Sequence, residues 1–300
     1  MSIARLCAAY GITRQAYYQE RRRRSQEAAR HTRILDLVRM LRRRHPRMGA
    51  RKLLVLLQPL LAQEELQIGR DRLFDLLRAA NLLVTRQRTG RRTTWPGSLR
   101  LPNRLAGLTI THINQVWVTD ITYLQLHNGR FVYLFVVMDL FSRAILGAVL
   151  GASLEASWAL EALQQAAMRA GTPLRGLIHH SDHGVQYTSH PYQQWLRAHS
   201  IIASMGEVGN SYDNAYAERV IGILKHEYAL VLPLVDEDQA RSAALESVYL
   251  YNHERPHQAR DYAFPMAIYQ GRAPASAFTV YQYPPPEAPQ PPRDEEVSAT

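Results

Sequence analysis

The stretch Trp117-Val118-Thr119-Asp120-Ile121-Thr122-Tyr123 determines how the rest of this 300-residue chain is interpreted. Its Val, Ile, Thr and Tyr residues favour extended backbone, and apolar residues on both sides of the acid predict a strand that is partly buried on both faces. A carboxylate in such a strand is costly to desolvate unless a partner compensates its charge. A lone aspartate would more simply be a strand-end or capping residue, so a functional Asp120 requires other acids to join it.

Two further acids lie in segments of different character. Asp182 follows the apolar pair Leu177-Ile178, and Glu218 lies in a stretch that predicts a helix. If the strands that carry Asp120 and Asp182 are neighbours, the two aspartates lie side by side, and Glu218 joins them from a helix packed beside the sheet. Hard oxygen ligands of this kind suit Mg²⁺ or Mn²⁺, and two ions about 3.5–4 Å apart would hold the attacking and leaving oxygens of a displacement. We therefore predict a metal site for phosphoryl transfer on DNA.

The net charge of +10 is concentrated in the first third of the chain. Residues 1–100 hold 23 Lys and Arg against 7 Asp and Glu, whereas residues 101–300 hold 13 against 19. This asymmetry predicts a polyanionic partner for the first third, most simply nucleic acid. The alternative is a solvated arginine-rich surface, because 34 of the 36 basic residues are Arg.

Cysteine usage and hydropathy exclude several classes of protein. The single cysteine, Cys7, excludes an internal disulfide framework and a multi-cysteine zinc site. No apolar run reaches eighteen residues, and the N-terminus lacks the apolar region of a signal peptide. We therefore expect a cytoplasmic protein without a membrane partner.

The first 84 residues predict a helical DNA-binding region. A short helix near residues 3–7, a break at Gly11 and an N-cap at Thr13 before a second helix over 14–20 form a helix-turn-helix pattern, which a plain helical hairpin would also produce. Arginines 21–24 follow as a phosphate-contacting run or linker, and amphipathic helices are expected over 28–44, over 50–61 and from 68–72 to 80. Arginine on one side and leucine on the other are typical of a winged-helix or helix-turn-helix domain. The residues predicted to contact DNA here are Arg14, Gln15, Arg21, Arg22, Arg23, Arg24, Arg51, Lys52 and Arg70.

Three further regions follow along the chain. Residues 85–110 are predicted to be a basic linker, because 85–94 show no apolar period, and Arg91 and Arg92 would lie along DNA. Residues 111–272 are predicted to form the catalytic core. Residues 273–300 are predicted to be a proline-rich, acidic tail that is disordered or docks in extended form.

From residue 116 the apolar period changes to that of strands. Asn128-Gly129 predicts a hairpin between strands over 116–126 and 131–139, and a third strand is expected over 144–150. A helix over 154–170, strands over 176–181 and 201–205 separated by a helix over 191–199, and helices over 214–228 and 236–251 follow, with Asp213 or Asn214 as the cap of the helix that carries Glu218. This order predicts an α/β, ribonuclease-H-like fold with a five-stranded mixed sheet and flanking helices, preceded by the all-α region.

Several linked motifs resemble one family. The stretch around Asp120, the segment His180-Ser181-Asp182-His183-Gly184-Val185-Gln186-Tyr187 and the segment from Asn210 through Glu218 to Glu227 resemble the integrase core of the insertion-sequence-three family of transposases. Between Asp182 and Glu218 lie 35 residues, the spacing associated with that family and with retroviral integrases. Lys225 matches the family's basic residue seven positions after the glutamate, and Tyr251-Asn252-His253-Glu254-Arg255-Pro256-His257 resembles its C-terminal motif.

The resemblance implies a DNA transposase. Asp120, Asp182 and Glu218 would be catalytic, metal-binding acids that hold two Mg²⁺ or Mn²⁺ ions, and water and then a DNA 3′-hydroxyl would attack phosphodiesters without ATP. The implied partners are the terminal inverted repeats, target DNA, further copies of the chain on DNA, and an upstream helix-turn-helix and leucine-zipper product. Because the chain begins at Met1 without a heptad run, we expect it to be the downstream product alone.

Three flanking residues receive supporting roles, each with a plainer alternative. Lys225 would contact the phosphate near the scissile bond, or is a solvated helix residue. His180 would support the site or contact DNA; the plainer alternative is a histidine at the end of a strand. Asn214 would shape the loop before the helix that carries Glu218; the plainer alternative is a helix cap. Two rival functions stay open: a related nuclease that hydrolyses without joining strands, and a catalytically silent DNA-binding regulator derived from a transposase.

Overall fold

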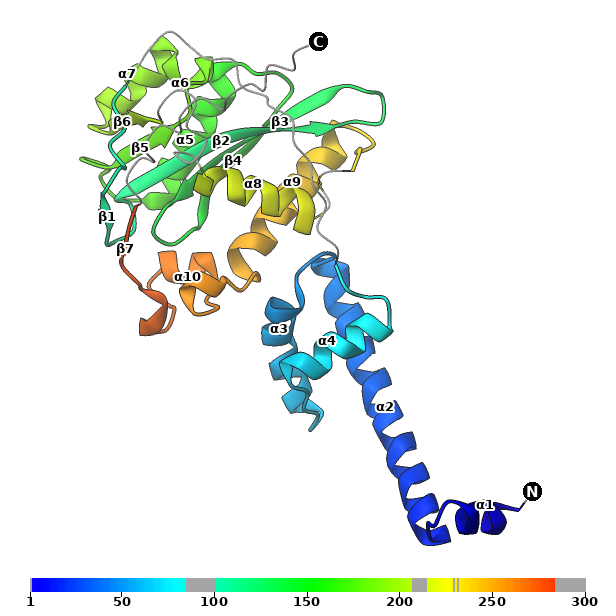
Figure 1. The fold of residues 1–300 in the computed structure, drawn as a ribbon. Coiled ribbons are helices and arrows are strands. Elements are labelled where there is room, and N and C mark those ends of the chain that lie inside the picture. The colour runs from blue at the N-terminus through cyan, green and yellow to red at the C-terminus, as the bar shows by residue number, and fades with distance from the viewer. Residues whose placement is uncertain (1, 85–100, 207–214, 229, 231, 284–300) are drawn as a thin grey trace, which may run out of the picture. The chain divides into compact units, whose positions relative to one another are not determined.

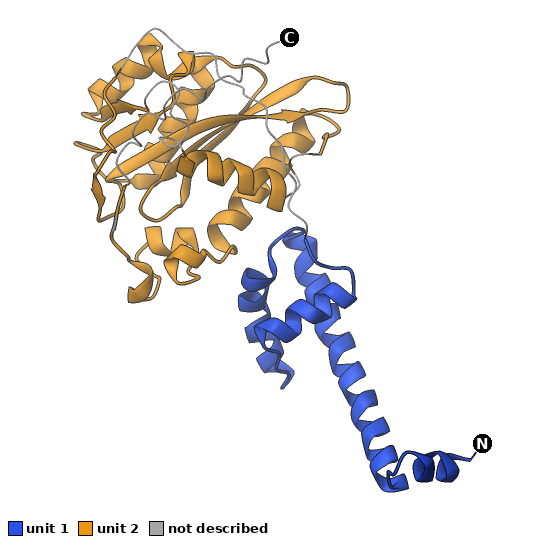
Figure 2. Cartoon of the chain, in the orientation of Figure 1, with its two compact units in different colours: residues 1–87 blue, residues 88–300 orange. Residues whose placement is uncertain are grey.

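The computed structural model describes residues 2–84, 101–206, 215–228, 230 and 232–283. The chain divides into two compact units, residues 1–87 and 88–300 (Figure 2). None of the described helices has the length and apolar character that a membrane span requires.

A five-stranded sheet forms the centre of the second unit, with the order β4-β3-β2-β5-β6. Its strands are β2 Val116–Gln125, β3 Phe131–Asp139, β4 Ile145–Gly151, β5 Ile178–Ser181 and β6 Ile202–Met205. The first three pair antiparallel, whereas β5 pairs parallel to both β2 and β6. This mixed sheet is the ribonuclease-H-like arrangement predicted from the order of the elements.

The hairpin between β2 and β3 forms where Asn128-Gly129 predicts it. Gly129 has φ of +82°, which glycine adopts without steric cost, and the Asn128 side chain accepts a hydrogen bond from the Arg130 backbone N–H at 3.0 Å. The hairpin pairs Asp120 with Val136 and ends at Trp117 opposite Asp139.

Helices cover both faces of the sheet (Figure 1). On one face lie α5 Ala156–Ala170, α6 Val185–Thr188 and α7 His190–Ala198, and on the other lie α8 Ala215–Glu227 and α9 Glu237–His253. Strand alternation sends Trp117 into the α5 side and Val116 and Val118 into the α8 side. Asp120 continues the Val116 and Val118 series, so its side chain belongs to the face that α8 covers.

The close approach of α5 to β4 requires a glycine. A Cβ atom at Gly147 would lie 2.0 Å from the carbonyl oxygen of Ala162, a distance that no real contact allows. Ala162 and Leu163 of α5 are fully buried against this part of the sheet.

The described ends of the second unit depart from the predicted boundaries. The short strands β1 Thr109–Ile110 and β7 Tyr281–Gln282 pair antiparallel, and α10 Pro265–Tyr269 and the short turns Gln258–Arg260 and Ala275–Ala277 precede β7. Leu105 and Ala277 are fully buried in the α8-side core. Residues 101–110, predicted as linker, and 273–283, predicted as tail, therefore contribute to this unit. Residues 85–100 and 284–300 lie outside the described residues.

The first unit is helical. It contains α1 Ile3–Ala9, α2 Arg14–Arg44, α3 Ala50–Gln63 and α4 Arg70–Ala79. Buried leucines of α3 and α4 pack against the second half of α2, among them Leu53, Leu57 and Leu73, which are at most 1% exposed. Residues 2–84 contain no strand, so the winged-helix alternative lacks its wing there. The Thr13 side chain caps α2 as predicted and accepts a hydrogen bond from the Ala16 N–H at 3.1 Å.

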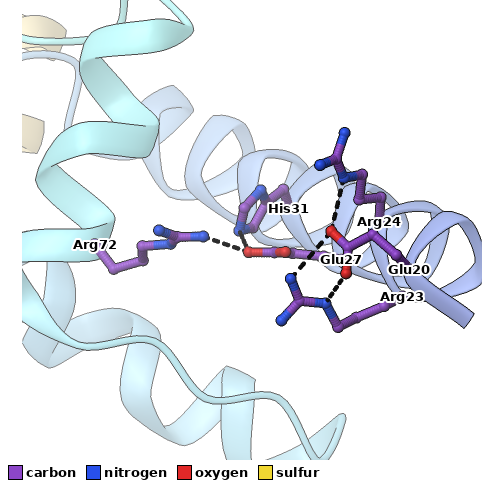
Figure 3. A network of polar contacts seen from close by, with 6 residues as sticks. All are labelled: Glu20, Arg23, Arg24, Glu27, His31 and Arg72. Carbon is purple, nitrogen blue, oxygen red and sulfur yellow. Dashed lines mark hydrogen bonds and ion pairs between the residues drawn. The ribbon is translucent and has the colours of Figure 1, made fainter. Parts of the chain in front are cut away.

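The predicted interruption of α2 is wrong, because residues 14–44 form one continuous helix. The intervening Arg, Gln, Glu and Ala residues are strong helix formers, and neither Gly nor Pro separates them. The Glu20 carboxylate pairs with Arg23 and Arg24, one turn later, at 2.8 Å each (Figure 3). These bonds lower the pKa of Glu20 to about 2. Arginines 21–24 are therefore part of the helix rather than a linker.

Ion pairs join α2 to the rest of the first unit. Glu27 of α2 is bonded by Arg72 of α4 and lies 3.7 Å from the His31 ring (Figure 3). Arg33 donates two bonds to Glu64, just after α3, at 2.6 and 2.5 Å. The bidentate pair fixes α2 against the end of α3.

Candidate active site

Strand pairing brings Asp120 and Asp182 to the same part of the sheet. The parallel ladder between β2 and β5 aligns Val118 with His180, and each aspartate lies two residues further along its strand direction. Asp120 lies within β2, which continues its pairing with β3, and Asp182 is the first residue after β5. The two strands are neighbours, as a shared site requires.

Backbone N–H groups orient both carboxylates. The Ile121 N–H donates to Asp120 Oδ1 at 2.8 Å, and the Gly184 N–H donates to Asp182 Oδ1 at 3.0 Å. A Cβ atom at residue 184 would lie only 3.0 Å from the same Asp182 oxygen. Glycine at this position therefore leaves room for the carboxylate while its backbone holds it.

Glu218 approaches from α8, in the first turn of that helix. Ala217, Val220 and Leu224 on the buried face of α8 join the core beneath β2 on the face of Asp120. Glu218 follows the buried Ala217 directly, and its own side chain is exposed. The helix therefore delivers the third acid to the region of the two aspartates.

The three carboxylates influence one another electrostatically. Burial raises the pKa of the Asp120 carboxyl well above its usual value, and the negative charges of Asp182 and then Glu218 raise it further. Partial burial raises the pKa of Glu218, and Asp182 adds to the effect. The acids thus lie close enough to repel, and a cation among them would relieve that repulsion.

The arrangement fits a hard divalent cation but is not closed around one. No three His, Cys, Asp or Glu side chains in the described ranges are near enough together to hold a metal ion as placed. The candidate donors are nevertheless all carboxylate oxygens, which Mg²⁺ and Mn²⁺ prefer, and Glu218 is an exposed side chain at the beginning of its helix. Closure around an ion would require the three carboxylates to move closer together.

Lys225 supplies positive charge beside the acids. Its Nζ lies 4.0 Å from the centre of the Tyr123 ring on β2, a cation–π contact that holds the ammonium on the Asp120 strand. Burial lowers the pKa of Lys225, and the negative charge of Asp120 opposes this shift. Lys225 in turn lowers the pKa of Asp120.

The histidines before Asp182 lie in the sheet interior. His180 is fully buried, and its Nδ1 lies 2.9 Å from the Ser204 hydroxyl on β6. Burial and the neighbouring His180 lower the pKa of His179 to about 3, and its Nε2 lies 3.0 Å from the Tyr192 hydroxyl. In this arrangement His180 reaches a neighbouring strand rather than solvent.

The remaining predicted residues fall into two groups. Asn214, Arg91 and Arg92 lie outside the described residues. The predicted DNA-contacting side chains of the first unit are exposed, except that Lys52 is partly buried. Arg23 and Arg24 pair with Glu20, and Arg70 pairs with Asp71 at 2.8 Å.

Sequence reasoning assigned no role to the residues that support α8. The Arg255 guanidinium makes two hydrogen bonds to Glu227 at the end of α8, and Arg143 stacks on the ring of Tyr216 in its first turn. The sequence does contain a signal for Arg255, because the segment Tyr251–His257 resembles a family motif to which no function is assigned.

Comparisons with known proteins agree on the kind of core. A family model described as integrase core domain matches residues 111–211, and a second model with that description matches residues 199–265. An uncharacterized 31 kDa protein of insertion element IS600 from Shigella sonnei is 32% identical over 84% of this chain and 93% of its own length. A putative transposase for insertion sequence element IS986/IS6110 from Mycobacterium tuberculosis is 33% identical over 70% of this chain and 77% of its length.

Shorter and more distant similarities accompany these. The transposase InsF for insertion sequence IS3A from Escherichia coli is 44% identical over 38% of this chain and 39% of its own length. Among solved structures, the HTLV-2 integrase catalytic core domain in complex with magnesium is 20% identical, with a TM-score of 0.43, over 53% of this chain and 97% of that one.

Proposed function

Because this chain belongs to the IS3 family of insertion-sequence transposases, we propose that Asp120, Asp182 and Glu218 carry out its DNA cleavage and strand transfer. The chain is a DNA transposase of the integrase-core type, a polynucleotidyl transferase. The observation that carries the residue assignment is the parallel pairing of β2 with β5, with α8 packed on the same face.

The three acids would hold the divalent metal on which this chemistry depends. Bound Mg²⁺ or Mn²⁺, two ions in our proposal, would activate the attacking oxygen and stabilise the leaving oxygen of the phosphodiester. The protein's own part would be orientation: the N–H groups of Ile121 and Gly184 bond the two aspartates, and α8 would bring Glu218 toward them. Lys225 would contribute a positive charge to the phosphate beside the scissile bond.

The DNA partners follow from the reaction. The ends of the element, its terminal inverted repeats, would be cut and then joined to target DNA, and a homo-oligomer would bring two ends together. In the first unit, DNA phosphates would be bound by Arg14, Gln15, Arg21, Arg22, Arg23, Arg24, Arg51, Lys52 and Arg70. Arg91 and Arg92 would do so beyond it. An upstream helix-turn-helix and leucine-zipper product, and a cytoplasmic, nucleoid-associated location, stay predictions.

A strand-transfer assay tests the proposal. Purified full-length chain would be mixed with labelled terminal DNA, target DNA and Mg²⁺, and compared with Asp120→Asn and Glu218→Gln. We expect joined products from the wild type and a loss of at least about 100-fold in each variant, since each removes charge where the reaction needs it. Glu161→Gln, an exposed substitution in α5, is the matched control and should leave the products unchanged.

The same assay distinguishes the rival functions. Cleavage without joining would overturn strand transfer in favour of a nuclease. Tight DNA binding without either reaction would favour a silent regulator. Wild-type joining by both acid variants would overturn the residue assignment.

A further inference from the structure

We propose that Arg255 and Glu227 are positioning residues, which set the place of Glu218 by locking the helix that carries it against α9. The proposal rests on the proposed function of the three acids and extends it to a part of the chain far from them in sequence. It also gives a task to the segment Tyr251–His257, which the site described above does not use.

The central contact is a buried, two-bond ion pair. Arg255 Nε donates to Glu227 Oε2 at 2.8 Å, and Nη2 donates to Oε1 at 2.9 Å. The Arg255 side chain is 4% exposed and that of Glu227 is 19% exposed. Two parallel bonds between planar groups fix direction as well as distance, which one apolar contact or one lysine ammonium does not.

The pair joins the two helices at a defined place. Glu227 is the last residue of α8, and Arg255 lies two residues after the end of α9. Glu218 is nine residues before Glu227, about two and a half turns or about 14 Å along the helix axis. A rotation or slide of α8 at the ion pair is therefore transmitted along a rigid helix to the acid.

Apolar packing alone would not set this position. Ala217, Val220 and Leu224 decide which face of α8 meets the sheet, but burial of apolar surface is not directional. The Glu218 side chain itself is exposed, so it is not enclosed in the apolar core. A directional contact elsewhere on the helix is what the arrangement needs.

The α9 side of the pair is itself fixed to the sheet. The Asn252 side chain bonds both backbone groups of Ile145 on β4, accepting from its N–H at 2.9 Å and donating to its carbonyl at 2.8 Å. Arg255 follows three residues later. The contacts thus run from β4 through Asn252 and Arg255 to Glu227 on α8.

The first turn of α8 has a second anchor. The Arg143 guanidinium lies 3.8 Å from the centre of the Tyr216 ring, two residues before Glu218. Arg143 lies in the turn after β3, with φ of +69°, and Asp139 holds that turn by accepting bonds from the N–H and hydroxyl of Ser142 at 2.7 and 2.6 Å. With one anchor at each end, the rotation of α8 is defined relative to the sheet.

The test separates positioning from simple stability. Arg255→Lys keeps the charge and removes the two-bond geometry, so the full-length variant should stay folded and bind terminal DNA within about 2-fold of the wild type. Mn²⁺ binding, measured by calorimetry on the DNA complex, should weaken about 10-fold because a displaced α8 misplaces the Glu218 carboxylate, and the strand-transfer rate should fall in parallel. Arg130→Lys is the matched control, because Arg130 bonds Glu237 at 2.9 Å on the surface, and it should change neither readout.

A double variant covers the case in which Arg255→Lys unfolds. Arg255→Met combined with Glu227→Met replaces the ion pair by an apolar contact, which commonly preserves a fold. We expect thermal stability near that of the wild type, with Mn²⁺ binding still weakened. Normal Mn²⁺ affinity and strand transfer in either folded variant would overturn the proposal. If Asp120→Asn and Glu218→Gln retain activity, the proposed function fails; if they lose it while the Arg255 variants behave as wild type, only the positioning role fails.

Discussion

Replacing Gly184 by alanine should slow strand transfer without weakening the fold. Gly184 has φ of −57° and ψ of 140°, a conformation open to any L residue, so the backbone tolerates a side chain. The added methyl would lie 3.0 Å from Asp182 Oδ1 and 3.0 Å from Gln186 Oε1, so these two oxygens must move away by a few tenths of an ångström. The strain therefore falls on the carboxylate that the Gly184 N–H now holds.

The magnitude follows from that displacement. A misplacement of 1 Å in a catalytic group costs about 100-fold, so a shift of a few tenths should lower the rate by about 3- to 10-fold. Alanine at a compatible position reduces the freedom of the unfolded chain and stabilises by about 0.4–1 kcal/mol, which offsets the contact strain. The melting temperature should therefore stay within about 3 °C of the wild type.

Gly49→Ala is the matched control. Gly49 precedes a helix, as Gly184 does, with φ of −67° and ψ of 150°, and a Cβ atom there meets no atom within 4 Å. Strand transfer under single-turnover conditions and thermal unfolding would be measured for both variants. A wild-type rate in folded Gly184→Ala would refute the reasoning that the Asp182 position limits the reaction, and a large loss of stability would show that residue 184 serves the fold instead.

Three further outcomes are expected. Burial lowers the pKa of His179 to about 3 in the folded protein, against 6.5 in the unfolded chain, so only the unfolded chain binds a proton as pH falls below 6.5. The free energy of unfolding should therefore be greatest above pH 6.5 and should fall by about 2 kcal/mol by pH 5. Denaturant unfolding measures this loss, and His179→Gln should remove it. Gly147→Ala should destabilise by about 1–3 kcal/mol or more in the same assay, because its methyl would lie 2.0 Å from the Ala162 carbonyl oxygen, whereas Gly49→Ala should not. Arg21→Ala and Arg22→Ala, on the exposed side of α2, should each reduce the salt dependence of DNA binding by about one counterion, measured by fluorescence anisotropy; an unchanged slope would remove them from the interface.

Local signals were sufficient for the centre of the sheet. The continuous apolar run and Asn128-Gly129 predict β3 over residues 131–139, and the structure has it with the same bounds. Asp139 is the last residue of that strand, and its carboxylate accepts hydrogen bonds from the N–H and the hydroxyl of Ser142 in the turn that follows. From the sequence, the pairing of β2 with β5 is only a condition for a shared acid site, and the structure meets that condition.

Other features depend on contacts that sequence order does not reveal. The pairing of β1 with β7 joins residues about 170 positions apart, and neither two-residue strand carries a periodic pattern of its own. The run of four arginines predicts a break in α2, but helix propensity and the bonds of Glu20 to Arg23 and Arg24 favour one continuous helix. The bond between Glu227 and Arg255 joins two helices whose packing has to be known first.

Anomalous diffraction from crystals of the full-length chain with terminal DNA and Mn²⁺ would show directly whether the three acids hold the metal. Manganese peaks should lie within bonding distance of the carboxylates of Asp120 and Asp182, with Glu218 completing the site. Manganese bound elsewhere, with these three carboxylates still apart at saturating Mn²⁺, would contradict this assignment.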